Sequence, residues 1–125
     1  MPMVIFVDDS ETALASTRMV TNSMPIEVKQ YLAAQDALAE ITSGAIVPDL
    51  IITDLNMPVM NGFEFLQELR KFAGTQRTPV LMLTTETKAE MKQQGKALGL
   101  TGWIVKPFNP AQLKQAISRV LRLPA

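Results

Sequence analysis

The sequence contains no cysteine and no histidine. Without cysteine the chain has no disulfide, no thiolate metal site and no thiol nucleophile. Without histidine it has no His-based catalytic triad, no imidazole metal ligand and no phosphohistidine, so any phosphoryl donor must be another molecule. These absences leave carboxylates, hydroxyls and lysines as the groups that can carry chemistry.

The chain also lacks an excess of charge of either sign, because 12 basic residues balance 12 acidic ones. A neutral chain is a poor non-specific binder of nucleic acid or of a membrane surface. No apolar run approaches the length of about 18 residues that a membrane span needs. The N-terminus enters its first apolar run without the basic region of a signal peptide. We therefore expect a cytoplasmic protein that binds neither nucleic acid nor membrane.

The length of 125 residues and the apolar content of 47% predict one domain over residues 1–125, with no attached output domain. Short apolar runs alternate with helical patterns along the whole chain. We predict strands at about 3–7, 27–32, 49–54, 79–84 and 102–106, and helices at about 10–22, 35–43, 61–73, 87–98 and 110–122. This alternation indicates the α/β class, a doubly wound five-stranded parallel sheet with helices on both faces.

Several helix ends carry recognisable signals. Asn109 suits the N-cap of the last helix, with Pro110 at its first position. Thr87 stands three residues before Glu90, which predicts a capping box at the start of the fourth helix. Gly99 suits the end of the same helix.

Three acidic residues follow two of the predicted strands. Asp8 and Asp9 end the first apolar run, and Asp54 ends the third. Ligands of an open parallel sheet bind outside the carboxyl ends of its strands, so the three carboxylates should meet at one edge. Clustered carboxylates repel each other unless a cation neutralises them. The sequence therefore predicts a site for a hard divalent metal, Mg²⁺ or Ca²⁺.

The wider pattern resembles a known family. The acid pair, the segment from Asp54 to Gly62, the segment from Leu81 to Glu86 and the Lys106-Pro107-Phe108 triplet resemble the receiver domain of bacterial two-component response regulators. The resemblance covers nearly the whole chain and is greatest to the single-domain chemotaxis (CheY-like) regulators. It implies a flavodoxin-like (βα)5 fold with strand order 2-1-3-4-5, an order taken from the family and not worked out from the residues.

The resemblance also implies a phosphoryl site. Asp54 matches the carboxylate that accepts a phosphoryl group from a histidine kinase. Asp8, Asp9, Asp54 and the backbone carbonyl of Asn56 match the groups that hold Mg²⁺, and no other cofactor is implied. Transfer to a weak carboxylate nucleophile depends on positioning and charge neutralisation, which these residue types supply.

Further positions match groups that respond to the phosphoryl group. Thr84 and Lys106 match the hydroxyl and the ammonium that bond its oxygens. Thr84 and Trp103 match the switch pair, in which the aromatic residue is usually Tyr or Phe. Asn56 and Glu86 match positions that orient the water for dephosphorylation, and we expect a short-lived acyl phosphate.

The implied function is a phosphorylation-activated switch. Its own phosphorylation and dephosphorylation are the only reactions expected, so it is not an enzyme in the usual sense. Phosphorylation should reshape the face made by the fourth helix, the fifth strand and the fifth helix. That face would bind a protein target, such as a flagellar motor or chemotaxis component, and a phosphatase would complete the set of partners.

Other readings remain open on sequence alone. The chain could act as a phosphorelay intermediate or phosphate sink between kinases. A haloacid-dehalogenase-type phosphatase also forms an aspartyl phosphate, but it needs a second acid where this chain has Asn56. A flavodoxin would need a phosphate loop after the first strand, where this chain is acidic.

The fourth predicted helix is polar and contains Gly95, which lowers the stability of a helix by about 1 kcal/mol relative to alanine.

Overall fold

The computed structural model describes residues 1–124 of the chain. Its first half contains β1 (Met3–Val7), α1 (Glu11–Thr21), β2 (Glu27–Tyr31), α2 (Ala34–Thr42) and β3 (Leu50–Thr53). The second half contains α3 (Gly62–Lys71), a short 3₁₀ turn (Ala73–Thr75), β4 (Val80–Thr84), α4 (Ala89–Ala97), β5 (Gly102–Val105) and α5 (Pro110–Leu121). Each predicted strand and helix is present, with ends that lie within two residues of the prediction.

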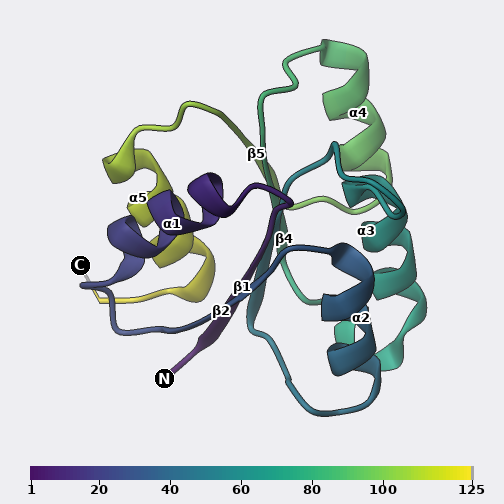
Figure 1. The fold of residues 1–125 in the computed structure, drawn as a ribbon, viewed down its shortest axis with the longest axis horizontal. Helices are drawn as coiled ribbons and strands as arrows, with labels where there is room; N and C mark the ends of the chain where they lie inside the picture. Colours follow the sequence, from purple (N-terminus) through teal and green to yellow (C-terminus); the bar gives the residue numbers. More distant parts are fainter. Residues whose placement is uncertain (125) are drawn as a thin grey trace.

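The five strands form one sheet in the order β2-β1-β3-β4-β5, and all neighbouring strands are parallel. In Figure 1 the sheet is seen nearly edge-on, with α1 and α5 on one side and α2, α3 and α4 on the other. The apolar side chains form a separate buried cluster on each face. The doubly wound α/β fold and the 2-1-3-4-5 order are therefore confirmed. Within residues 1–124, no helix has the length and apolarity needed to cross a membrane.

Backbone hydrogen bonds continue one residue beyond the carboxyl ends of the strands. The amide of Asp8 donates to the Tyr31 carbonyl at 3.0 Å, and the amide of Asp54 donates to the Val7 carbonyl at 2.9 Å. These bonds extend the hydrogen-bond ladder of the sheet, so the backbone of both acidic residues is held as firmly as the strands are. The register of the buried strands thus decides where the carboxylates lie.

The start of α3 carries a capping box that the sequence analysis did not predict. The Asn61 side chain accepts the Glu64 amide and the Glu64 carboxylate accepts the Asn61 amide, each at 2.9 Å. The box predicted for α4 is wrong, since Lys88 is its N-cap and makes no side-chain capping bond. The amides of Thr87 and Lys88 donate instead to the Glu86 carboxylate, at 3.2 Å and 3.1 Å. The Glu86 carboxylate therefore takes the Thr87 amide, which the Glu90 side chain would accept in a capping box.

The predicted ends of α4 and α5 are confirmed. Gly99 has a φ of +93° and follows the last turn of α4. Its amide and that of Leu100 bond back to carbonyls of the helix, which is the usual glycine-terminated end. Asn109 caps α5 by accepting the Ala111 amide at 2.8 Å.

Gly62 is required by a close approach at the start of α3. A Cβ at this position would lie 2.4 Å from the carbonyl oxygen of Asp54. The Gly62 amide donates to the Leu55 carbonyl at 2.8 Å, which closes the loop between β3 and α3. The glycine thus lets α3 begin directly against the backbone of the strand end that carries Asp54.

We predict that the Asn61→Ala substitution lowers the free energy of unfolding by about 1 kcal/mol, because it removes the acceptor of a helix N-terminal amide. The matched control is Thr87→Ala, at the position where a cap was expected and none is found. It should change the free energy of unfolding by less than about 0.5 kcal/mol. Urea denaturation of both variants measures the difference, and equal losses would contradict the assignment of the caps.

Candidate functional site

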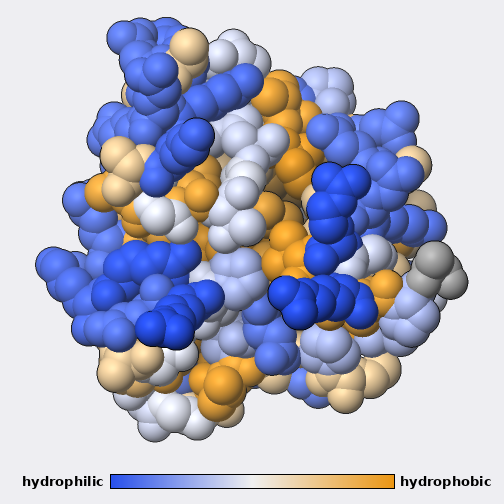
Figure 2. Space-filling view, turned by 180° about the vertical axis from the view of Figure 1, so that it is seen from behind, coloured by the Kyte–Doolittle hydropathy of each residue, from blue (hydrophilic) through white to orange (hydrophobic). Residues whose placement is uncertain are grey.

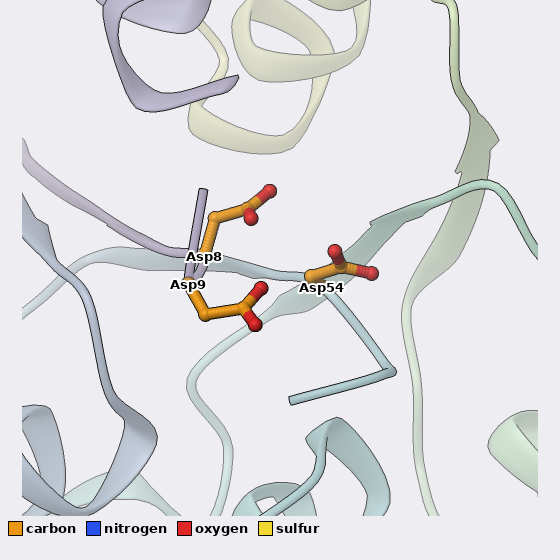
Figure 3. Close-up of side chains that lie close together, drawn as sticks. All are labelled: Asp8, Asp9 and Asp54. Carbon is orange, nitrogen blue, oxygen red and sulfur yellow. The ribbon is translucent and has the colours of Figure 1, made fainter. Parts of the chain in front are cut away.

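Three carboxylates converge at the carboxyl edge of the sheet. Asp8, Asp9 and Asp54 each offer one oxygen, and these oxygens all lie within 4.8 Å of one another. Figure 3 shows the Asp8 and Asp9 side chains, from the end of β1, reaching toward Asp54 at the end of β3. Asp8 is buried, Asp54 is partly buried and Asp9 is exposed. The cluster predicted from the sequence is therefore assembled by the fold.

Lys106 is the positive charge at this cluster. Its ammonium donates to the Asp8 carboxylate and, at 3.2 Å, to Oδ2 of Asp54. The three side chains are only 16%, 8% and 13% exposed, for Lys106, Asp8 and Asp54 in that order. Water and salt therefore screen these ion pairs much less than they screen a surface pair.

Burial and charge act on these groups in opposite directions. Burial raises the pKa of Asp8 above its ordinary value, although the hydrogen bond from Lys106 opposes the shift. Burial lowers the pKa of Lys106, but the hydrogen bond and charge of Asp8 and the charge of Asp54 outweigh it and raise the pKa. Lys106 thus stays protonated and remains a fixed cation in the site.

One ammonium against three carboxylates leaves two negative charges when all four groups are ionised. A divalent cation would balance this charge. All the donor atoms are oxygens, which suits a hard cation such as Mg²⁺ or Ca²⁺ and disfavours softer metals. The residues present therefore fit the metal that the sequence predicted.

The two oxygens of Asp54 are in different environments. Oδ1 accepts the Leu55 amide at 2.6 Å, whereas Oδ2 faces the Lys106 ammonium. The backbone amide holds the orientation of the carboxylate, so Oδ2 remains turned toward the cation. The carboxylate is thus held at one oxygen and presents the other to the Lys106 ammonium.

Thr84 is the last residue of β4 and is fully buried. Its carbonyl accepts the Lys106 amide at 2.8 Å, so the two residues are joined through the sheet. Its hydroxyl accepts the Glu86 amide at 3.3 Å. This is a long and weak bond in which the hydroxyl is the acceptor, so its own hydrogen can still donate to another group.

The two positions predicted to tune dephosphorylation have different surroundings. Asn56 is exposed on the loop after β3, two residues beyond Asp54. The carboxylate of Glu86 is engaged by the amides of Thr87 and Lys88. Asn56 is therefore the freer of the two to orient a water molecule.

Trp103 is half-buried on β5, one of the two edge strands of the sheet. Its ring packs against Phe63, with ring centroids 6.4 Å apart and an angle of 51° between planes. The indole Nε1–H donates to the Glu86 carbonyl at 3.0 Å. Through this bond the aromatic residue holds the same loop whose Glu86 amide contacts the Thr84 hydroxyl.

Gly95 has a packing role that the sequence analysis did not recognise, because it interpreted this residue only as a helix defect. It is the buried residue of α4, and a Cβ there would lie 2.9 Å from Leu100, 3.2 Å from Phe63 and 3.5 Å from Trp103. The missing side chain makes room for Leu100 and Phe63, and Phe63 in turn packs against the Trp103 ring. The signal was present in the sequence as a helical glycine eight residues before an unusually large aromatic residue.

Fold and site together define a doubly wound α/β domain with an acidic, lysine-paired site at the carboxyl edge of its sheet. The sequence pattern of the response regulator receiver domain matches residues 4–118. The chain belongs to this family of two-component signalling domains. The corresponding prediction from the sequence is thus confirmed.

Relatives within the family include regulators of bacterial chemotaxis. The crystallised chemotaxis protein CheY4 of Vibrio cholerae is 44% identical, with a TM-score of 0.88 over 96% of this chain and 98% of that one. CheY-3 of Vibrio cholerae is 39% identical over 72 residues, which is 58% of this chain and 55% of that protein.

Other relatives carry receiver domains in larger proteins. The phosphate regulon regulator PhoB of Rhizobium meliloti is 30% identical over 98% of this chain. The sensor histidine kinase CheAY of Helicobacter pylori is 27% identical over 97% of it. The chain spans 53% and 15% of the length of these two relatives. Receiver domains typically act as signalling switches rather than enzymes, and they bind Mg²⁺ in an acidic pocket.

We predict that Gly95→Ala changes the environment of Trp103, because the new methyl group would crowd Leu100 and Phe63, and Phe63 packs against the indole. A shift in tryptophan emission and in its accessibility to a quencher should report this change. Alanine would otherwise stabilise the helix by about 1 kcal/mol, and the clash should cancel that gain. The control is Gln94→Ala, on the exposed side of α4, which should leave the emission unchanged. Full stabilisation of Gly95→Ala with unaltered emission would show that the glycine has no such packing role.

Proposed function

We propose that this chain is a phosphorylation-activated switch whose Asp54 accepts a phosphoryl group from the phosphohistidine of a histidine kinase. The observation that carries the proposal is the asymmetry of Asp54. One of its oxygens is held by a backbone amide, and the other faces Lys106 beside the Asp8–Asp9 pair. Phosphoryl transfer depends mainly on such positioning and charge neutralisation.

In the proposed transfer, a carboxylate oxygen of Asp54 forms a bond to phosphorus as the bond from phosphorus to the donor's imidazole nitrogen breaks. The nitrogen keeps the electron pair and is left as neutral or reprotonated histidine. Mg²⁺, held by Asp8, Asp9, Asp54 and the backbone carbonyl of Asn56, would neutralise the negative charge of the incoming group. Lys106 is already at Oδ2 and needs only a short movement to bond a phosphoryl oxygen.

The proposed switch runs from Thr84 to Trp103. The Thr84 hydroxyl, which now accepts the Glu86 amide, would donate to a charged phosphoryl oxygen, a strong acceptor. Its movement would disturb the Glu86 loop, which Trp103 holds through the indole N–H. The face made by α4, β5 and α5 would change shape as a result. Asn56 and Glu86 are proposed to orient the water that later hydrolyses the acyl phosphate.

The face around Trp103 has room for a protein partner. A groove of about 360 Å³ runs between β5 and α5, and one of about 210 Å³ lies between α4 and β5, with Trp103 lining both. Figure 2 shows this side of the molecule, where apolar surface lies between hydrophilic side chains of the flanking helices. The similarity to CheY4 and CheY-3 favours a chemotaxis target over a role as a phosphate sink.

We predict that acetyl phosphate labels the wild type in the presence of Mg²⁺, and that Asp54→Asn abolishes the label. Removal of Mg²⁺ with a chelator should also abolish it, and so should Asp9→Ala. The control is Asp36→Asn, an exposed acid on α2, which should label normally. Quantitative labelling of another residue in the Asp54→Asn variant would overturn the assignment of the acceptor.

Trp103 provides an intrinsic reporter of the switch, because it is the only tryptophan. We predict that Mg²⁺ with beryllofluoride, a phosphoryl mimic, changes its emission and its accessibility to acrylamide. The same additions should have no effect on Asp54→Ala. An identical spectrum with and without the mimic, in a sample shown to bind it, would make Trp103 a packing residue and not the switch.

A further inference from the structure

The loop between β3 and α3 contains a strained residue at its tip. Val59 has a φ of +71°, and the Met60 amide donates to the Pro58 carbonyl at 2.8 Å. A bond of this kind across a single residue of positive φ makes a γ-turn of the rarer, strained hand. For a β-branched residue such a conformation is an outlier. Glycine or asparagine would adopt it at lower cost.

The rest of the loop imposes this conformation on Val59. Leu55 and Met57 are buried on one side of the turn, and Met60 packs against the core on the other. The bond from Gly62 to Leu55 then closes the loop. Val59 itself is 86% exposed and belongs to no core cluster among the described residues. Neither packing nor backbone preference within the chain accounts for a valine here.

The position of the turn suggests what it is for. Val59 lies five residues beyond Asp54, so even an extended chain would place it at most about 18 Å away. The loop folds back on itself, which brings its tip closer. A standard protein interface covers about 800 Å² of each partner, a patch of roughly 16 Å radius. A partner centred on Asp54 would therefore cover Val59.

A protein that delivers a phosphoryl group must be centred there. The Asp54 side chain is only 13% exposed, so the donor histidine has to enter between the loops at the carboxyl edge of the sheet. The surface around that histidine must then rest on those loops. A small donor such as acetyl phosphate can reach the carboxylate without this contact.

We propose that Val59 is an apolar contact for the protein phosphodonor, held outward by the strained turn so that docking buries it. This inference rests on the proposed function, since it assumes phosphoryl transfer to Asp54. It extends that function by naming a residue that selects protein donors over small ones. Loss of one buried valine contact should weaken productive docking by about tenfold.

Two substitutions separate the apolar contact from the strain. Val59→Thr keeps the branched shape, and so the strain, but replaces a methyl group by a hydroxyl. Val59→Asn removes both the apolar group and the β-branch. The matched control is Val47→Asn, the same change at a site that is 74% exposed in the loop leading into the opposite end of β3.

The experiment measures transfer from a radiolabelled phosphohistidine domain. Such domains of the source organism's own kinases are first screened on the wild type, and the one that transfers fastest is used. Both Val59 variants should lose about tenfold in kcat/KM with this donor and label normally with acetyl phosphate. Of the two variants, only Val59→Asn should raise the melting temperature of the protein, by roughly 2–5 °C, because only this change removes the β-branch. Val47→Asn should match the wild type in transfer and should not gain stability.

Each other outcome has a distinct meaning. Wild-type transfer from the kinase domain to both Val59 variants would overturn the docking role and leave Asp54 as the acceptor. An equal loss with acetyl phosphate would also overturn it, because the defect would then lie in the site itself. Failure of the wild type to accept phosphate from any donor would overturn the proposed function, and the docking role with it.

Discussion

The ion pair network of Lys106 with Asp8 and Asp54 is the interaction on which the rest of the site depends. Three carboxylates in a small volume repel one another, and the fold tolerates them because a partly buried ammonium sits between two of them. The compensation is incomplete, so the site retains negative charge, which a divalent cation would balance. In the proposed transfer the same ammonium would also bond a phosphoryl oxygen. Lys106 thus stabilises the resting carboxylates and is also the cation available for the proposed chemistry.

The register of the strands fixes where these groups lie. Two glycines set how closely α3 and α4 approach their neighbours in the fold. Gly62 lets α3 begin against the Asp54 carbonyl, and Gly95 lets α4 lie close to Leu100 and Phe63, beside Trp103. An alanine would crowd the Asp54 carbonyl in the first case and the Leu100 and Phe63 side chains in the second. Neither residue contacts a phosphoryl group, yet both define the space in which the response would occur.

The helix that borders the face of Trp103 is the least firmly held. The start of α4 has no side-chain cap, and Gly95 is its buried residue. Its connection to the site runs through the Glu86 loop, which the Trp103 indole and the Thr84 hydroxyl both contact through hydrogen bonds. Segments with few buried contacts are those in which a local change most readily shifts the conformational balance. A weak helix next to a firmly held acidic site is therefore a suitable output element.

The sequence by itself determined the class of fold and the acidic cluster. Alternating apolar runs and helical stripes leave few topologies, and strand ends mark the edge where Asp8, Asp9 and Asp54 must meet. It also indicated the caps at Gly99 and Asn109, because those signals are local.

Only the tertiary structure decided which donor satisfies which acceptor and where close packing requires a glycine. The Thr87–Glu90 pattern looked like a cap, but the Glu86 carboxylate accepts the Thr87 amide that Glu90 would bond in such a cap, and the helix begins one residue later. Val59 gave no sign of its role in the sequence, and the helical glycine Gly95 and the large Trp103 became related only when the fold brought them together. The reason is physical, since a steric contact or an imposed backbone angle depends on residues that are distant in the chain and adjacent only after folding.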